Sequence, residues 1–192
     1  MRVAVVYHMF PHYRAAVLRA LESSERHAYT FFGSPAAYAG IKPLAAAALR
    51  RFVPAPFLVW GGAYWQPVAI RVALAREFDA VIYLGNPNFA STWIGAALGR
   101  LAGKRILFWT HGWLKRERPV KAWLRRRFFG LAHRVLVYGE RAKALGAAEG
   151  FPAERIAVIY NSLDVEAAAR VYEALERGEA AIHPRLLFAE PQ

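Results

Sequence analysis

Cysteine is absent from the 192 residues, so the sequence offers no disulfide, no thiolate metal site and no cysteine nucleophile. Acidic residues are scarce: 14 Asp and Glu stand against 26 Lys and Arg, which gives a net charge of +12. No uncharged run approaches the roughly 18–20 residues that a membrane-spanning helix requires. The first apolar run, residues 3–7, is too short for a signal peptide. We therefore expect a soluble or peripheral protein without a transmembrane segment.

Three familiar active-site motifs are missing as well. The first apolar run is not followed by the G-x-G-x-x-G turn of dinucleotide-binding domains, and no G-x-x-x-x-G-K-[ST] loop is present to hold phosphates. The G-x-S-x-G turn of α/β-hydrolases is also absent. His8 and His12 are four residues apart, but Pro11 disfavours a regular helix between them and no third metal ligand accompanies them. We expect no metal site and no bound cofactor.

Short β-branched and aromatic runs alternate with Ala-, Leu- and Arg-rich stretches of helical spacing. Strands are expected at residues 3–7, 29–33, 57–60, 80–84, 105–110, 135–138 and 156–160. Helices are expected at residues 15–22, 67–77, 91–101, 120–132, 142–149 and 165–177. With 56% hydrophobic residues to fill a core, this alternation predicts an α/β fold, a Rossmann-like parallel sheet with helices on both faces.

Ligands of such sheets bind outside the carboxyl ends of the strands. The loops expected at that edge are residues 8–14, 61–65, 85–89, 111–113 and 139–141. His111 follows an apolar strand and precedes Gly112, which permits close backbone approach. Its imidazole can exchange a proton or hold a sugar hydroxyl, and a loop histidine bonded to backbone is the alternative. Asn86 and Asn88 flank Pro87, a pattern that fits a turn as well as a ligand contact.

More than half of the net charge lies in residues 115–134, which contain eight basic residues and one acid, Glu117. The helix expected at residues 120–132 has an apolar stripe bordered by basic residues, namely Lys121, Arg125, Arg126 and Arg127. Two interpretations fit this helix, and they are compatible: a surface helix packed on the sheet, and a patch for an anionic membrane, where each Lys or Arg contributes roughly 1 kcal/mol. The basic residues lack interleaved aromatics and a nucleic-acid-binding motif, which argues against nucleic acid as a partner.

Three passages resemble glycosyltransferase family 4, whose members have the two-domain GT-B fold. Residues 2–7 followed by Phe-Pro-His-Tyr-Arg at 10–14 resemble the opening of some bacterial sugar transferases of the family. Residues 108–113, Phe-Trp-Thr-His-Gly-Trp, resemble the strand-then-His motif of its acceptor domain. Residues 135–164 are the most specific and resemble the family's passage Gly-x-Pro-x-Glu-Lys-Ile-x-Val-Ile-x-Asn-Gly-Val-Asp. The resemblance covers nearly the whole chain, most weakly at residues 34–75.

The resemblance implies one half of such an enzyme. Residues 1–163 would form the N-terminal, acceptor-side domain, and residues 164–192 would be a linker helix and the start of a donor domain. Residues 186–189 resemble the first strand of that donor domain, whose E-x7-E carboxylates are absent. The usual glycine-rich turn after the first strand is replaced by residues 8–14, and Ser162 stands where glycine is commoner. An excised domain, a shortened reading frame and a split enzyme all fit.

For function, the resemblance implies retaining transfer of a sugar from a nucleotide sugar to a saccharide or lipid-linked acceptor. The nucleotide sugar would bind only through a second domain or a partner chain. His111 would be the catalytic residue, and the acceptor would be bound by His8, His12, Tyr13, Arg14, Asn86, Asn88, Gly112 and Trp113. The protein would be cytoplasmic and peripheral on the inner face of the membrane. The alternatives are a basic module for anionic surfaces or nucleic acid, and a non-catalytic remnant of a transferase.

Overall fold

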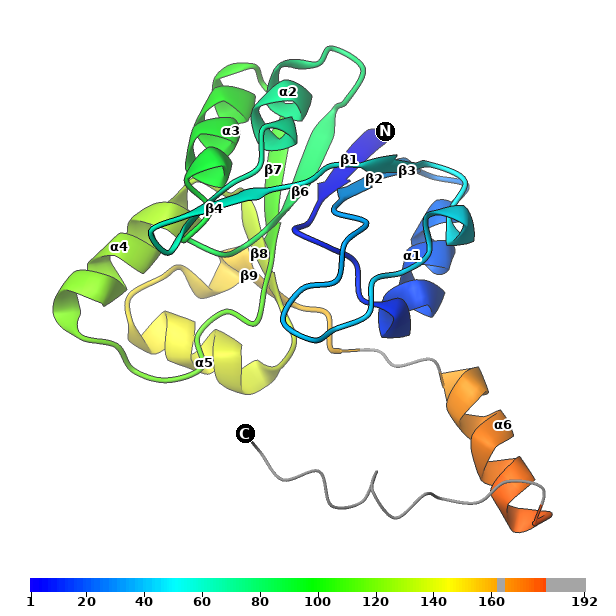
Figure 1. The fold of residues 1–192 in the computed structure, drawn as a ribbon. Helices are drawn as coiled ribbons and strands as arrows, with labels where there is room; N and C mark the ends of the chain where they lie inside the picture. Colours follow the sequence, from blue (N-terminus) through cyan, green and yellow to red (C-terminus); the bar gives the residue numbers. More distant parts are fainter. Residues whose placement is uncertain (162–164, 179–192) are drawn as a thin grey trace.

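Seven parallel strands form the main sheet of the computed structural model, which describes residues 1–161 and 165–178 (Figure 1). The strands are β1 (Arg2–Val6), β2 (Ala28–Gly33), β3 (Phe52–Pro54), β6 (Ala80–Leu84), β7 (Arg105–Trp109), β8 (Arg134–Val137) and β9 (Ile156–Val158). Their order across the sheet is β3-β2-β1-β6-β7-β8-β9, and all neighbours pair in parallel. The Rossmann-like α/β fold predicted from the sequence is confirmed.

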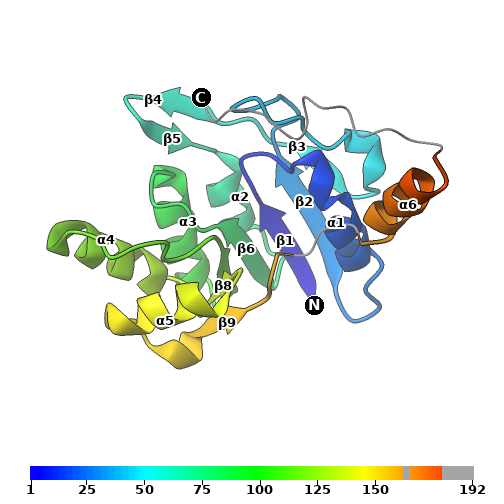
Figure 2. The same cartoon turned by 90° about the horizontal axis from the view of Figure 1, so that it is seen from below.

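Helices cover both faces of the sheet, but unevenly (Figure 2). One face carries α2 (Val68–Leu74), α3 (Ala90–Leu101), α4 (Pro119–Gly130) and α5 (Glu140–Ala148). The other face carries α1 (Ala15–Glu22), which follows the short 3-10 turn η1 (His12–Arg14). Two further 3-10 turns are η2 (Ala46–Ala48) and η3 (Ala153–Arg155).

A hydrophobic core lies on each face of the sheet, because successive side chains of a strand point to opposite faces. Ala4 and Val6 of β1 pack toward the face with four helices, whereas Val5 and Tyr7 pack toward α1 and its Leu18. β1 lies between β2 and β6, and after the exposed Arg2 its residues Val3–Val6 are all apolar and buried, as expected of a strand covered on both faces. β1 ends at Val6, so Tyr7 and then His8 follow it at the carboxyl edge of the sheet.

The third strand of the sheet is not the one that the sequence predicts. Residues 57–60 were expected there, but Leu58–Trp60 forms β4, which pairs antiparallel with β5 (Ala63–Trp65) in a separate two-stranded sheet. Gly61 and Gly62 turn the chain between them with φ of 54° and 80°, a region that glycine tolerates best. The edge position is taken by β3, which pairs with β2 from Phe52 onward.

The last helix expected from the sequence is present as α6 (Val165–Glu176). The proposed boundary at residues 163 and 164 and the strand-like residues 186–189 lie outside the described residues. The division into an acceptor-side domain and the start of a donor domain therefore stays a prediction.

The close approach of α3 to α2 depends on Gly95. A Cβ atom built on Gly95 would lie 2.5 Å from the carbonyl oxygen of Ala69, a backbone atom that cannot move aside alone. We expect Gly95→Ala to lower the free energy of unfolding by about 1–3 kcal/mol, the usual cost of overpacking. The matched control is Gly130→Ala at the end of α4, where nothing lies within 4 Å of the added atom.

The control should be neutral or gain up to about 1 kcal/mol, because alanine restricts the unfolded chain more than glycine does. Urea denaturation of both variants and the wild type measures the difference. Equal stability of Gly95→Ala and Gly130→Ala would contradict the packing argument.

Candidate functional site

The order of the strands reverses beside β1. The chain runs from β1 outward through β2 to β3, then returns to β6 on the other side of β1. The loops after β1 and β6 therefore diverge, and a crevice between them is the usual ligand position in such sheets. A pocket of about 390 Å³ lies there, between the loops that follow β1, β6 and β7.

This pocket brings together most of the site residues predicted from the sequence. Its lining includes His8, Tyr13, Arg14, Asn86, His111 and Gly112. These residues come from three loops that are up to about a hundred positions apart in the sequence. Parallel pairing of β1, β6 and β7 alone places their carboxyl ends at one edge. No Asp or Glu of the described residues lines the pocket.

Three predicted site residues lie elsewhere. His12 is exposed, and its Nδ1 donates to the carbonyl of Lys42 at 3.2 Å. Asn88 is exposed, and its backbone N–H donates to Oδ1 of Asn86 at 3.0 Å, so this pair also makes the turn. Trp113 is only 2% exposed and packs on Phe129 inside the core. Its ring is held inside the core by packing against Phe129 and Phe151.

Arg14 is the most unusual residue of the site. It is 7% exposed, and its guanidinium lies 5.6, 4.9 and 5.1 Å from the ring centroids of Tyr7, Trp109 and Tyr138. One nitrogen, Nη2, donates to the Tyr138 hydroxyl, whereas the buried Nε and Nη1 have no hydrogen-bond partner. Aromatic faces attract a cation, which is how three rings can hold this charge without a carboxylate.

His8 lies on the other side of the pocket, within an aromatic cluster. Its ring is 5.3 Å from that of Tyr38 and 6.1 Å from that of Phe57, and its buried Nδ1 has no hydrogen-bond partner. Burial disfavours the charged ring, and the positive charge of Arg14 adds to this effect. Together they lower the pKa of His8 from 6.5 to about 4. The imidazole is therefore neutral at physiological pH.

His111 is held by an aromatic contact. Its ring meets that of Tyr138 edge to face at 4.8 Å. Burial, followed by the charge of Arg14, lowers the pKa of His111 below 6.5, so this imidazole is also neutral near pH 7. Gly112 follows with φ of 71°, and a Cβ there would lie 2.7 Å from Cγ1 of Val137. Only glycine suits this position, as the sequence suggested.

The basic residues of α4 separate into two groups. Arg125 was expected on a membrane-facing surface, but it turns inward, lines the pocket and pairs with Glu117 at 2.7 Å. Lys121, Arg126 and Arg127 are exposed. The difference arises because Arg125 lies on the side of α4 that faces the loop after β7, where Glu117 supplies its counter-charge.

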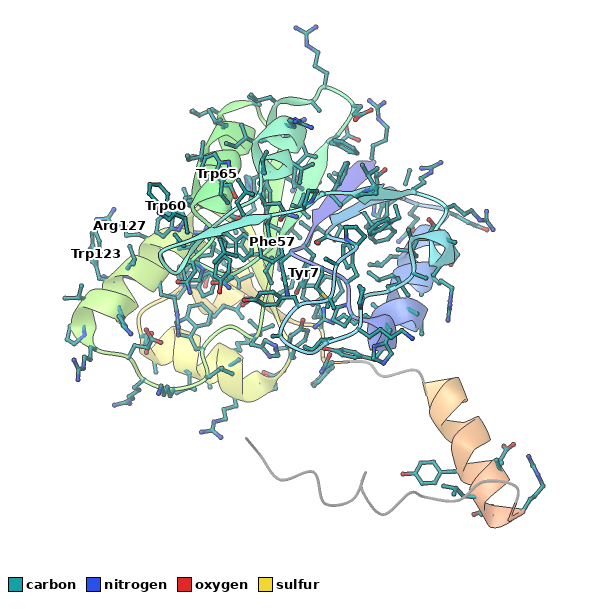
Figure 3. All side chains as sticks on the ribbon, in the orientation of Figure 1. Tyr7, Phe57, Trp60, Trp65, Trp123 and Arg127 are labelled. Carbon is teal, nitrogen blue, oxygen red and sulfur yellow. The ribbon has the colours of Figure 1, made fainter. Side chains whose placement is uncertain are left out.

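The apolar stripe expected on α4 is divided as well. Phe128 is fully buried against Phe108, but Val120, Trp123 and Leu124 are 78%, 49% and 46% exposed. Trp123 points away from the body of the protein, and Arg127 lies 5.3 Å from its ring (Figure 3). Only the C-terminal end of α4 packs on the sheet, so its first two turns offer apolar and basic side chains to the solvent.

Sequence reasoning missed several residues that shape the site. Tyr7, Trp109 and Tyr138 enclose Arg14, and each stands at or just beyond the end of a buried strand. Their position at the carboxyl ends of expected strands could have identified all three as site residues from the sequence. Tyr38 also lines the pocket, but it comes from residues 34–75, where the sequence pattern is weakest.

Within residues 1–161 and 165–178, no three His, Cys, Asp or Glu side chains lie close enough together to hold a metal ion. In the same ranges, no helix is both long and apolar enough to cross a bilayer.

The neutral state of His8 predicts a pH dependence of stability. The unfolded chain takes up a proton on His8 below pH 6.5, whereas the folded chain resists protonation down to about pH 4. The free energy of unfolding should therefore fall as the pH is lowered through this window. We expect His8→Phe, which keeps an aromatic ring in the cluster, to flatten that decline. Urea denaturation across the window measures it, and an unchanged slope in His8→Phe would contradict the assignment.

Solved structures of similar fold were found. The apo form of the lipopolysaccharide outer core galactosyltransferase WaaB matches with a TM-score of 0.54 and 16% identity, over 85% of this chain and 46% of that one. Anabaena HepE in complex with UDP and glucose matches with a TM-score of 0.56 and 15% identity, over 86% and 46% of the two chains. UDP-GlcNAc 2-epimerase from Neisseria meningitidis, bound to UDP-GlcNAc, matches with a TM-score of 0.52 and 13% identity, over 82% and 45%.

These matches show the fold, and this chain spans less than half the length of the three proteins. It corresponds to one half of a GT-B structure. No curated protein matches the sequence. The family model of Glycosyltransferase Family 4 matches residues 8–167, a range that includes the loops after β1, β6 and β7. The chain belongs to glycosyltransferase family 4.

Proposed function

We propose that this chain is the acceptor-binding half of a retaining glycosyltransferase, which transfers a sugar from a nucleotide sugar to a saccharide or lipid-linked acceptor. Membership of the family supports the transfer chemistry. Because the chain spans about 46% of the similar transferases, the nucleotide sugar would be held by a second domain or a partner chain. The observation that carries the proposal is the pocket at the strand-order reversal, into which His8, Asn86 and His111 converge.

The chemistry of the pocket suits a hydroxylated ligand. Asn86 can both donate and accept hydrogen bonds, and the neutral imidazoles of His8 and His111 can do the same. Tyr13, which is 44% exposed, offers an aromatic face at the mouth. Sites for small ligands combine apolar walls with a few convergent polar groups in this way.

His111 is the proposed catalytic residue. It lies on the rim of the pocket, exposed on one side and held by Tyr138 on the other. A neutral imidazole in that place can orient an acceptor hydroxyl and accept its proton as the new glycosidic bond forms. At the same time, the bond between the donor sugar and the nucleotide phosphate breaks, and the nucleotide leaves with that electron pair. Burial and Arg14 keep the ring neutral, and therefore able to act as a base.

Transfer by the reconstituted enzyme tests this role. Together with a donor half, in one chain or as a separate chain, the wild type should transfer sugar and His111→Ala should be slower by about 10²–10⁴-fold. Both the rate per folded molecule and the melting temperature are to be measured. The control is His12→Ala, since His12 is exposed and outside the pocket.

The possible results are distinct. A destabilised His111→Ala with the wild-type rate would make His111 a structural residue and overturn its assignment. If His12→Ala loses as much rate as His111→Ala, the loss is not specific to the pocket, and the catalytic assignment of His111 is overturned. Absence of transfer by the folded wild type with competent donor halves would favour the non-catalytic remnant.

We further propose that α4 rests on the inner, anionic face of the cell membrane. Val120, Trp123 and Leu124 are exposed beside Lys121, Arg126 and Arg127, a combination typical of helices that lie on a lipid surface. Tryptophan prefers the headgroup level, and basic residues are attracted by anionic lipids. A location on the membrane would bring the pocket to a lipid-linked acceptor.

Vesicle co-sedimentation tests the surface. Changing Lys121, Arg126 and Arg127 together to Gln should abolish binding to anionic vesicles without changing the circular dichroism. Arg125 is left intact because it pairs with Glu117. The control changes three exposed arginines at the amino ends of the strands, Arg26, Arg50 and Arg76, and so removes the same charge.

Binding of the wild type should also weaken with salt, because the Debye length falls from about 10 Å at 0.1 M to about 3 Å at 1 M. If the control triple variant loses binding as fully as the α4 variant, net charge rather than α4 is responsible. A wild type that ignores anionic vesicles at low salt leaves α4 as an ordinary surface helix.

A further inference from the structure

The guanidinium of Arg14 is a buried charge without a counter-charge. Of its five N–H donors, those on Nε and Nη1 have no partner, and Nη2 donates to the Tyr138 hydroxyl. In the described part of the chain, no carboxylate is paired with it. Burying an ion without a counter-charge is unfavourable, and here three aromatic rings and the Tyr138 hydroxyl stand in for the missing carboxylate.

Arg14 also lies between two pockets. One is the pocket of about 390 Å³ that contains His111, and it has no acidic lining residue. The other, of about 360 Å³, lies on the α1 face of the sheet and is mostly apolar, with Leu21 and Ile159 among its lining residues. Arg14 is the single charged side chain that lines this second pocket in the described residues. The same guanidinium therefore forms part of the wall of both pockets.

We propose that Arg14 binds a phosphate group of the acceptor. The inference rests on the proposed function, because it assigns the ligand of that same pocket. Nε and Nη1 together carry three free N–H groups, and a phosphate presents three strong acceptor oxygens. Guanidinium groups bind phosphate through several N–H···O contacts at once, which a lysine cannot reproduce. The phosphate supplies the missing negative charge and places the rest of the acceptor next to His111.

The acceptor phosphate has two sources, a soluble sugar phosphate or the head group of a lipid. Two probes separate them: sn-glycerol 3-phosphate has no apolar chain, whereas octyl phosphate adds a chain that fits the apolar pocket beside Arg14. Calorimetry with the 192-residue chain should show binding of at least one probe. Tighter binding of octyl phosphate indicates a lipid source, and equal or tighter binding of sn-glycerol 3-phosphate indicates a soluble one.

The role of Arg14 is tested by substitution. Arg14→Gln should weaken phosphate binding by about tenfold or more, because charge-assisted hydrogen bonds are lost. The matched control, Arg76→Gln, removes an exposed arginine before β6 and should leave affinity unchanged. Arg14→Lys carries the test if Arg14→Gln does not fold, since it keeps the charge while losing the planar fork, and it should also bind at least tenfold more weakly.

Binding should be visible in stability as well. A saturating phosphate probe should raise the melting temperature of the wild type by about 3 °C and leave that of the folded Arg14 variant unchanged. The inference is overturned if the wild type binds neither probe, or if the folded Arg14 variants bind them as the wild type does. Arg14-dependent binding of UDP-glucose in preference to both probes assigns the site to the donor and overturns the acceptor assignment.

The outcome is distinguishable from failure of the proposed function. Sugar transfer that depends on His111, together with indifference to phosphate, would leave the enzyme intact and remove only the phosphate site. Phosphate binding through Arg14 in a chain that never supports sugar transfer would keep the phosphate site and overturn the proposed transferase function.

Discussion

Parallel pairing on both sides of β1 is the constraint on which the site depends. β1 pairs with β2 through Arg2 to Val6 and with β6 through Val3 to Val6, so three carboxyl ends meet at one edge. Because the chain continues in opposite directions from this point, the loops there separate and leave a pocket. The close approach of the neighbouring strands needs a small residue at Gly85, where a Cβ would lie 2.7 Å from Cβ of Thr110.

The aromatic enclosure of Arg14 is a consequence of the same edge. Tyr7 follows β1, Trp109 ends β7 and Tyr138 follows β8, so parallel strands deliver three rings to one place. The charge that they hold influences both histidines of the pocket, since it lowers the pKa of His8 and of His111. Burial is the larger cause of both pKa shifts, and this cation adds to it, so the two imidazoles that would meet an acceptor are neutral. The electrostatic effect of Arg14 requires burial, because water would screen it at the surface.

α4 serves two surfaces at once. Its Arg125 faces the pocket through the ion pair with Glu117, and its Arg126 and Arg127 face solvent. A run of basic residues in the sequence does not show which side chain turns inward. In α4 that depends on the position of Glu117 in the preceding loop, which pairs with Arg125. The sequence therefore predicts one basic surface on α4, and the structure divides its residues between the pocket and the solvent.

Strand and helix alternation, the parallel sheet and the edge that carries the site followed from the sequence, since apolar periodicity and chain chirality determine them. The sequence alone also indicated His111 and Gly112, which lie where the strand expected at residues 105–110 ends. Only the tertiary structure decided that Trp113 turns into the core while Tyr138 reaches His111. The third strand likewise depended on long-range pairing of β3 with β2. The direction of a loop side chain is set by what packs against it from distant parts of the chain, and no local pattern records those neighbours.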